Sequence, residues 1–252
     1  MNRIVAAVVV RMGSSRLPGK TLAEVNGVPL LGFLIARLRQ SKLITRIVVA
    51  TTDTEKDDPI AAYCEQHELA IFRGSEDDVL GRMVGAYQSL KTDICVEAFG
   101  DGPLIDPQVV DLVIQRFLDA NGEIDLVGND MKTTYPPGMD VEAFSMSAFE
   151  KSDSMTSDPA IREHGTSFMR QNPGIFRLLN IEAPEHHHRP ELEIEVDTEE
   201  DFEVVKTVIE HFAPRTDFTL DEIIAFLDSR PEIAALNQAV HRRWKEYRTD
   251  DD

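Results

Sequence analysis

Short apolar runs rich in β-branched residues alternate along the chain with longer segments in which apolar residues recur every three or four positions. The first pattern is typical of buried strands and the second of amphipathic helices. The apolar runs predict strands over residues 4–10, 46–51, 70–72, 94–98, 125–127, 140–144, 176–179 and 192–196. The helical pattern predicts helices over residues 29–40, 59–67, 79–90, 107–118, 160–171, 198–212 and 220–229, with a C-terminal piece near 234–247.

The alternation of strands and helices through about residue 128 predicts an α/β fold, a mainly parallel sheet covered by helices on both faces. Residues 130–190 are less regular and rich in Pro, Ser, Met and His, which indicates an insertion or lid that carries acceptor contacts. We therefore expect one main domain over residues 1–215, with the insertion at about 130–190, and a C-terminal helical extension over 216–252. Ligands of such sheets bind beyond the carboxyl ends of the strands.

The segment RMGSSRLPGKT, residues 11–21, directly follows the first predicted strand. It differs from a P-loop, G-x4-G-K-[ST], because five residues separate Gly13 from Gly19. A P-loop also begins a long helix, whereas the Asn26-Gly27 turn signal moves the next predicted helix to Pro29. The segment is therefore not a P-loop.

The residue types of this segment still favour binding of a phosphate group. Gly13 and Gly19 allow backbone N–H groups to approach an anion closely, and Arg11, Arg16 and Lys20 supply positive charge. The chain has a formal net charge of −19, yet no Asp or Glu occurs among its first 23 residues. The alternative is a surface loop with ordinary basic residues.

The composition excludes several classes of protein. The acidic net charge argues against general nucleic-acid binding, which needs a basic surface. No apolar run approaches the ~20 residues of a membrane span, and the N-terminal segment lacks the small-residue cleavage site of a signal peptide. Cys64 and Cys95 show no metal or redox spacing. We expect a cytoplasmic protein with two reduced thiols and no nucleic-acid or membrane partner.

The segment RMGSSRLPGK resembles the signature of the cytidylyltransferases that activate 3-deoxy-ulosonic and nonulosonic acid sugars, and most of all the spore coat polysaccharide biosynthesis protein F branch. Further matching segments follow in order: VATTDTEKDD (49–58), FRGSEDDVLGR (72–82), GDGPLIDP (100–107), GMDVEAF (138–144), REHGTSFM (162–169) and EVDTEEDFE (195–203). One departure is Gly102, where that branch commonly has a bulkier residue, and this difference could widen the base or acceptor pocket. The resemblance spans about residues 3–212.

The resemblance implies a Rossmann-like nucleotidyltransferase domain of the glycosyltransferase-A type. It also implies a reaction: with Mg²⁺, CTP and a carboxylated sugar give a CMP-sugar and diphosphate, for surface polysaccharide biosynthesis. A homodimer through residues 130–190 follows from the same analogy. Two alternatives stay open, a nucleotidyltransferase that acts on a sugar-1-phosphate or phosphonate, and a non-catalytic nucleotide-binding homologue.

The site residues are assigned partly by this resemblance. Asp101 follows a predicted strand in a glycine-flanked turn, and Asp197 directly follows the run LEIEV; both are expected to bind the metal ion. For Asp197 the alternative is a helix cap made by Asp197 or Thr198, and Asp106 is expected to be only a cap. Arg16, Lys20 and Asp101 are the expected catalytic residues. The nucleotide is expected to contact Arg11, Met12, Gly13, Ser14, Arg16, Lys20, Thr52, Arg73 and Asp101.

Acceptor recognition is assigned to Glu142, Arg162 and His164, since a guanidinium and an imidazole suit an acceptor carboxylate. Ordinary ion pairing of the helical REH segment is the alternative. The run His186-His187-His188 is expected to be an incidental polar loop, because neighbouring side chains point apart.

Overall fold

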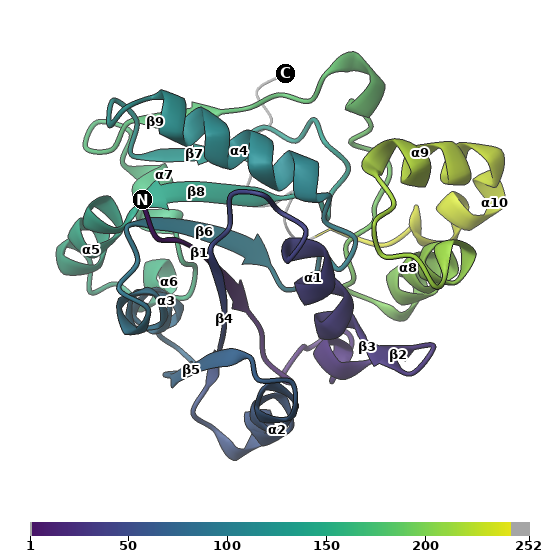
Figure 1. Ribbon diagram of the computed structural model, residues 1–252, viewed down its shortest axis with the longest axis horizontal. Helices are drawn as coiled ribbons and strands as arrows, with labels where there is room; N and C mark the ends of the chain where they lie inside the picture. Colours follow the sequence, from purple (N-terminus) through teal and green to yellow (C-terminus); the bar gives the residue numbers. More distant parts are fainter. Residues whose placement is uncertain (1, 243–252) are drawn as a thin grey trace.

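The computed structural model describes residues 2–242. Its centre is a seven-stranded sheet in the order β5-β4-β1-β6-β8-β7-β9 (Figure 1). The strands of the main sheet are β1 (Ile4–Val9), β4 (Arg46–Thr52), β5 (Ala70–Gly74), β6 (Ile94–Phe99), β7 (Leu126–Gly128), β8 (Val141–Ser145) and β9 (Leu178–Asn180). A separate hairpin consists of β2 (Glu24–Val25) and β3 (Val28–Pro29).

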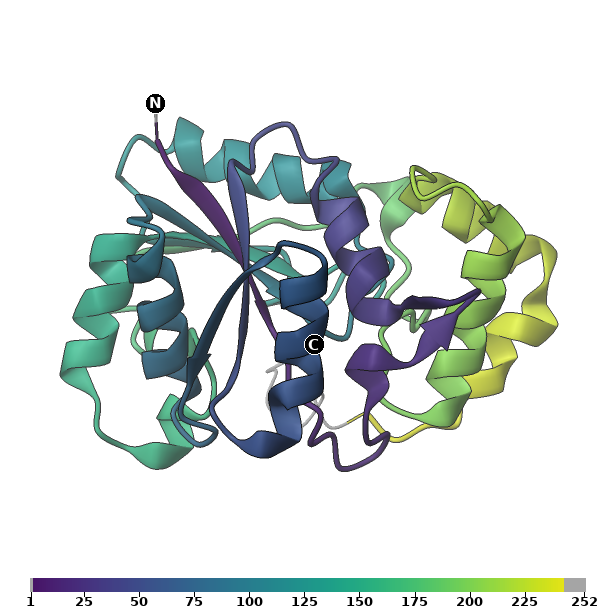
Figure 2. The ribbon, with the colours of Figure 1, turned by 60° about the horizontal axis from the view of Figure 1, so that its bottom comes forward.

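Helices lie on both sides of the sheet (Figure 2). The α-helices are α1 (Leu30–Leu38), α2 (Asp58–Gln66), α3 (Val79–Ser89), α4 (Pro107–Asp119), α5 (Met146–Met155), α6 (Pro159–Arg162), α7 (Ser167–Gln171), α8 (Glu199–Phe212), α9 (Leu220–Ser229) and α10 (Pro231–Ala234). Single 3₁₀ turns are η1 (Lys20–Leu22), η2 (Glu55–Asp57), η3 (Glu185–His187) and η4 (Ala235–Asn237).

The strand pairing positions the functional loops. β1 pairs in parallel with β4 and β6, and β4 pairs in parallel with β5. β8 is antiparallel to both β6 and β7, so the sheet is mixed but mainly parallel, as predicted. Because parallel strands end at the same edge of a sheet, the loops after β1, β4, β5 and β6 lie together.

The first strand is apolar throughout because both of its faces are buried. Val5 and Ala7 belong to the core on one side of the sheet, with α3 and α5. Ala6 and Val8 belong to the larger core on the other side, which also receives apolar residues of α1, α4, α8 and α9. A strand covered on both faces has no polar alternation, and the run IVAAVV shows none.

Two expectations for the middle of the chain are wrong. Residues 192–196 are not a strand: Ile194 N donates to Pro137 O (3.0 Å) and Val196 N to Asp101 O (2.8 Å), so their N–H groups bond to loops instead of a neighbouring strand. The helix expected over 160–171 is interrupted between α6 and α7 at Gly165. A Cβ at this glycine would lie 2.4 Å from Met83 Sδ, so Gly165 allows a close approach to α3.

The segment 130–190 contributes β8 and β9 to the main sheet and supplies α5 to α7. Helix α5 has no counterpart among the predicted helices. Its N-cap Ser145 accepts a hydrogen bond from Ala148 N (3.1 Å). The role of this segment as a lid or dimer contact stays a prediction.

The C-terminal extension packs on the main body through Arg37 of α1. This guanidinium is fully buried and donates to Ile105 O (2.7 Å), Thr216 O (2.8 Å) and Phe218 O (2.9 Å). Burial lowers the pKa of Arg37 to about 10, so the side chain stays charged at neutral pH. In the described part of the predicted helix 234–247, α10 ends at Ala234 and one 3₁₀ turn follows, so no helix continues to residue 242; residues 243–247 lie outside the described chain.

Replacing Arg37 with methionine is expected to lower the free energy of unfolding by about 3 kcal/mol, because the buried carbonyl groups of Ile105 and Phe218 lose this donor and Thr216 O keeps only its bond from Gln40 Nε2 (3.0 Å). Urea unfolding measures the change. The exposed neighbour Arg39, replaced with methionine, is the control and should have little effect. Equal stability of the two variants would contradict this role of Arg37.

Candidate active site

The loop after β1 folds into a closed turn that ends at Lys20. Gly19 has a φ of 78°, a left-handed conformation that favours glycine, and its N–H donates to Met12 O (3.0 Å). Lys20 begins the single 3₁₀ turn η1, and the β2–β3 hairpin follows. The predicted difference from a P-loop is therefore confirmed, since no α-helix begins at Lys20.

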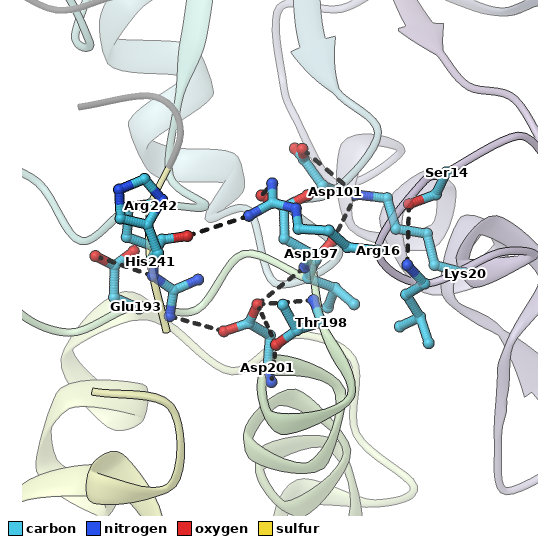
Figure 3. Close-up of polar contacts among 12 residues, drawn as sticks. Ser14, Arg16, Lys20, Asp101, Glu193, Asp197, Thr198, Asp201, His241 and Arg242 are labelled. Carbon is cyan, nitrogen blue, oxygen red and sulfur yellow. Dashed lines mark hydrogen bonds and ion pairs between the residues drawn. The ribbon is translucent and has the colours of Figure 1, made fainter. Parts of the chain in front are cut away.

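Lys20 connects the two predicted metal ligands. Its Nζ lies 2.9 Å from Asp197 Oδ1 and 3.7 Å from Asp101 Oδ2, and it donates to Val196 O (2.6 Å) (Figure 3). Asp101 follows β6 and Asp197 precedes α8, so the fold brings together acids that are far apart in sequence. The structure thus places a cationic group of the loop between both carboxylates.

Arg16 contacts the same carboxylate from another side. Its guanidinium pairs with Asp197 Oδ2, and its Nη1 donates to the carbonyl oxygen of His241 (3.4 Å). The helix-cap alternative is confirmed for Thr198, which is the N-cap of α8 and forms a capping box with Asp201, and it is wrong for Asp197 itself. The carboxylate of Asp197 is therefore directed to the loop of residues 11–20, which we call the basic loop.

The charge balance keeps Lys20 protonated. Burial alone would lower the pKa of Lys20, but the neighbouring carboxylates of Asp101 and Asp197 outweigh burial and raise it. The Lys20 side chain is only 15% exposed and that of Asp197 16%, so water screens this pair weakly. Fixed positive charge at a partly buried position suits a polyanionic ligand.

A sequence model of the family described as cytidylyltransferase matches residues 5–238. This chain belongs to the cytidylyltransferase family. Over 244 residues it is 32% identical to the spore coat polysaccharide biosynthesis protein SpsF of Bacillus subtilis (strain 168), covering 95% of this chain and 100% of that protein. The resemblance noted in the opening loop is thereby confirmed at the level of the family.

Solved structures agree with the fold of this cytidylyltransferase. A cytidylyltransferase from Leptospira borgpetersenii serovar Hardjo-bovis (strain JB197) matches with a TM-score of 0.88 and 32% identity, covering 96% of this chain and 100% of that one. A CMP:2-keto-3-deoxy-manno-octonic acid synthetase complexed with CTP matches with a TM-score of 0.61 over 83% of this chain and 99% of that one. At 19% identity the second match concerns the fold alone.

Asp57 fixes the start of the basic loop in this cytidylyltransferase. The buried Asp57 carboxylate accepts hydrogen bonds from Met12 N (2.7 Å), Thr51 Oγ1 (2.9 Å) and Thr52 Oγ1 (2.6 Å). Burial opposes ionisation, but these donors outweigh burial and lower the pKa of Asp57. Met12 and Thr52, two predicted nucleotide contacts, are thus held by one carboxylate that the sequence did not single out.

The variant Asp57→Asn is expected to lower the free energy of unfolding at pH 7 by about 1–3 kcal/mol, because an amide replaces a carboxylate among four donors. The pKa of Asp57 is lower in the folded protein than in the unfolded chain. The stabilisation by the ionised carboxylate is therefore fully present above the unfolded-state pKa and is lost as the pH falls through the folded-state pKa. Urea unfolding should therefore show the two proteins converging below about pH 4. The exposed Asp58→Asn serves as control, and a pH-independent difference would contradict the account.

The other predicted nucleotide contacts differ in their surroundings. The Arg11 side chain is 44% exposed and lies 3.7 Å from Glu76. Ser14 Oγ accepts from Leu17 N (3.3 Å), within the loop that contains Gly13. Arg73 donates to Thr52 O (2.9 Å) and Thr54 O (2.7 Å), so it braces the loop after β4. Their roles toward a nucleotide stay predictions.

Two of the predicted acceptor residues, Arg162 and Glu142, are paired with other side chains. Arg162 is held by Asp78 (2.9 Å) and Asp153 (2.7 Å), which is the ion pairing left open above. Glu142 is fully buried and accepts from Arg170 Nε (2.8 Å). His164 is exposed in the break between α6 and α7. Arg162 and Glu142 are therefore engaged in separate ion pairs.

Sequence reasoning missed several buried acids beside this site. Glu97 in β6 is paired with Glu142 in the neighbouring strand β8. Burial, together with the charge of Glu142, raises the pKa of Glu97 well above its usual value. Glu195 lies two residues before Asp197, and burial together with Asp101 raises its pKa in the same way. The available signal was a glutamate flanked by apolar residues, in ICVEAF and in LEIEV.

The histidine run is only partly an incidental loop. His186 and His187 lie in η3 with ring centroids 4.1 Å apart, and His187 Nε2 lies 2.9 Å from Asp221 Oδ1 of α9. Potential ligand atoms of these three residues lie within 4.8 Å of one another. The expectation that the neighbouring histidines point apart is therefore wrong, since a 3₁₀ turn brings their rings together.

Among residues 2–242, no helix has the length and apolar character that a membrane span requires.

Proposed function

We propose that this cytidylyltransferase transfers a cytidylyl group from CTP to an acidic sugar acceptor with Mg²⁺ and releases diphosphate. One observation carries the proposal: the ammonium group of Lys20 lies within 3.7 Å of both Asp101 and Asp197. A reaction of this class needs cations for the triphosphate and carboxylates for a metal ion at the same place. The family match supports the cytidylyl group.

Arg16 and Lys20 would bind the triphosphate and stabilise the charge that develops on departing diphosphate. Both are now paired with Asp197. Phosphate oxygens accept hydrogen bonds from these cations as carboxylate oxygens do. Arg16 and Lys20 can therefore exchange the carboxylate of Asp197 for phosphate oxygens of the nucleotide. Arg16 offers a planar pair of donors and Lys20 a mobile point charge.

The carboxylates of Asp101 and Asp197 fit a magnesium ion. Carboxylate oxygens of Asp101 and Asp197 both lie near one cation, the ammonium group of Lys20. In proteins Mg²⁺ is commonly held by one or two carboxylates together with phosphate oxygens and water. When bound, Mg²⁺ would neutralise phosphate charge and make the acceptor hydroxyl more acidic. The chain's own contribution is to hold both acids beside the basic loop.

The acceptor class is supported by relatives of this chain. A 3-deoxy-manno-octulosonate cytidylyltransferase of Trichlorobacter lovleyi is 33% identical over 124 residues, which cover 48% of this chain and 47% of that protein. The name of that enzyme denotes an acidic sugar, and we extend that class to the acceptor of this chain. A cytoplasmic location and a homodimer stay predictions.

A diphosphate-release screen tests the function. Purified protein is incubated with CTP, UTP, ATP or GTP, with or without Mg²⁺, and with a panel of ulosonic and nonulosonic acids, sugar-1-phosphates and phosphonates. We expect release with CTP, Mg²⁺ and an acidic sugar only. CTP binding without release from any acceptor would instead favour a non-catalytic homologue.

A further inference from the structure

The last described residue, Arg242, returns to the start of α8. Its side chain is only 3% exposed, although it lies near the end of the chain. Its Nη2 donates to Asp201 Oδ1 (2.8 Å) and to Asn237 O (3.1 Å), and its Nε lies 3.5 Å from Glu193 Oε1. Figure 3 shows this guanidinium beside the loop that carries Asp197.

Asp201 links Arg242 to Asp197. One oxygen of the buried Asp201 carboxylate, Oδ2, accepts from the backbone N–H groups of Asp197 (3.1 Å) and Thr198 (2.9 Å). The other oxygen, Oδ1, accepts from Arg242 and from Asn237 Nδ2 (2.8 Å). The backbone position of Asp197 therefore depends on a carboxylate whose opposite side is held by the C-terminal segment.

A buried carboxylate of this kind needs its cation. Asp201 is fully buried, and the Arg242 guanidinium is paired with its carboxylate at 2.8 Å. Without Arg242 the carboxylate would be left buried without its cation, a costly state that favours rearrangement of the loop. The same segment touches Arg16, whose Nη1 donates to His241 O.

We propose that Arg242 is a positioning residue for the active site: through Asp201 it fixes Asp197, and the adjoining His241 carbonyl orients Arg16. The C-terminal extension would then complete the metal and triphosphate site instead of serving only as packing. This inference rests on the proposed function, because it assigns Asp197 to a metal ion.

The test compares Arg242→Met and Arg242→Lys with the wild type. Arg230→Met is the matched control, because Arg230 belongs to the same extension but forms an exposed pair with Glu232. Mn²⁺ binding in the presence of CTP, without acceptor, is followed by electron paramagnetic resonance. The Mg²⁺ concentration for half-maximal diphosphate release is measured in parallel, and thermal unfolding reports the folded fraction.

Arg242→Met is expected to weaken Mn²⁺ binding roughly 10-fold and to raise the half-maximal Mg²⁺ concentration by a similar factor, as is typical of groups that orient a metal ligand. Arg242→Lys should recover part of both effects, since it keeps the charge but not the forked contact, and Arg230→Met should match the wild type. If Arg242→Met does not fold, Arg242→Lys carries the test with the same direction of change.

Wild-type Mn²⁺ affinity in folded Arg242 variants, even with a lower unfolding temperature, would overturn the inference and leave Arg242 with a structural role only. A wild-type protein that neither binds Mn²⁺ with CTP nor releases diphosphate would overturn the proposed function itself, and this inference with it. The two failures are distinguished by the behaviour of the wild type.

Discussion

Replacing Lys20 with methionine is expected to lower the rate of diphosphate release by about 10²–10³-fold while the protein stays folded. Methionine keeps much of the aliphatic stem of lysine but removes the charge that lies 2.9 Å from Asp197 and 3.7 Å from Asp101. The developing charge on diphosphate would lose a fixed partner. Steady-state kinetics with CTP, and circular dichroism for the fold, measure the outcome.

The same variant is expected to increase the affinity for a metal ion, although it lowers the rate of diphosphate release. Without nucleotide, Lys20→Met should bind Mn²⁺ more tightly than the wild type, because the ammonium group no longer competes for the two carboxylates. Lys132→Met, which removes an exposed pair with Glu182, is the control and should change neither quantity. Turnover equal to that of the wild type would rule out the assigned role of Lys20.

Asp197→Asn is expected to reduce diphosphate release by about 10³-fold or more. The change removes one of two charged ligands proposed for the metal ion, and it also removes the ion-pair partner of Arg16 and Lys20. CTP binding in the absence of Mg²⁺ should be retained or become tighter, since both cations lose a competing carboxylate. Kinetics and isothermal titration of CTP with and without Mg²⁺ separate the two effects.

Asp93→Asn is the matched control for that variant. Asp93 directly precedes β6, the strand whose other end leads to Asp101, and it pairs with the exposed Arg3 (2.7 Å). It should leave the kinetics unchanged. If Asp197→Asn kept most of the wild-type rate at every Mg²⁺ concentration, the proposed metal site would be wrong.

The main sheet could be predicted because its strands are short apolar runs with clear turn signals between them. Periodicity failed where the environment, not the local pattern, decides the conformation. ELEIEV has the alternation of a strand, yet its N–H groups bond to Pro137 and Asp101 in two different loops. Helix α5, with the polar sequence MSAFEKSDSM, lacks the apolar stripe that would have revealed it.

The candidate site was predictable in part. Charge and glycine placement in residues 11–21, and acids placed after strands, pointed to Arg16, Lys20, Asp101 and Asp197, and the fold brings these four together. Pairing between distant segments could not be foreseen. The Arg162 guanidinium is paired with Asp78 and Asp153. Asp57 and Arg242 act through hydrogen bonds with residues far away in the sequence.

Anomalous diffraction from crystals grown with Mn²⁺ and CTP tests the central claim most directly. The account predicts one Mn²⁺ peak bonded to carboxylate oxygens of both Asp101 and Asp197, with the triphosphate against Arg16 and Lys20. A peak elsewhere, for example at His186, His187 and Asp221, with no metal at Asp101 and Asp197 and the triphosphate away from the basic loop, would contradict it.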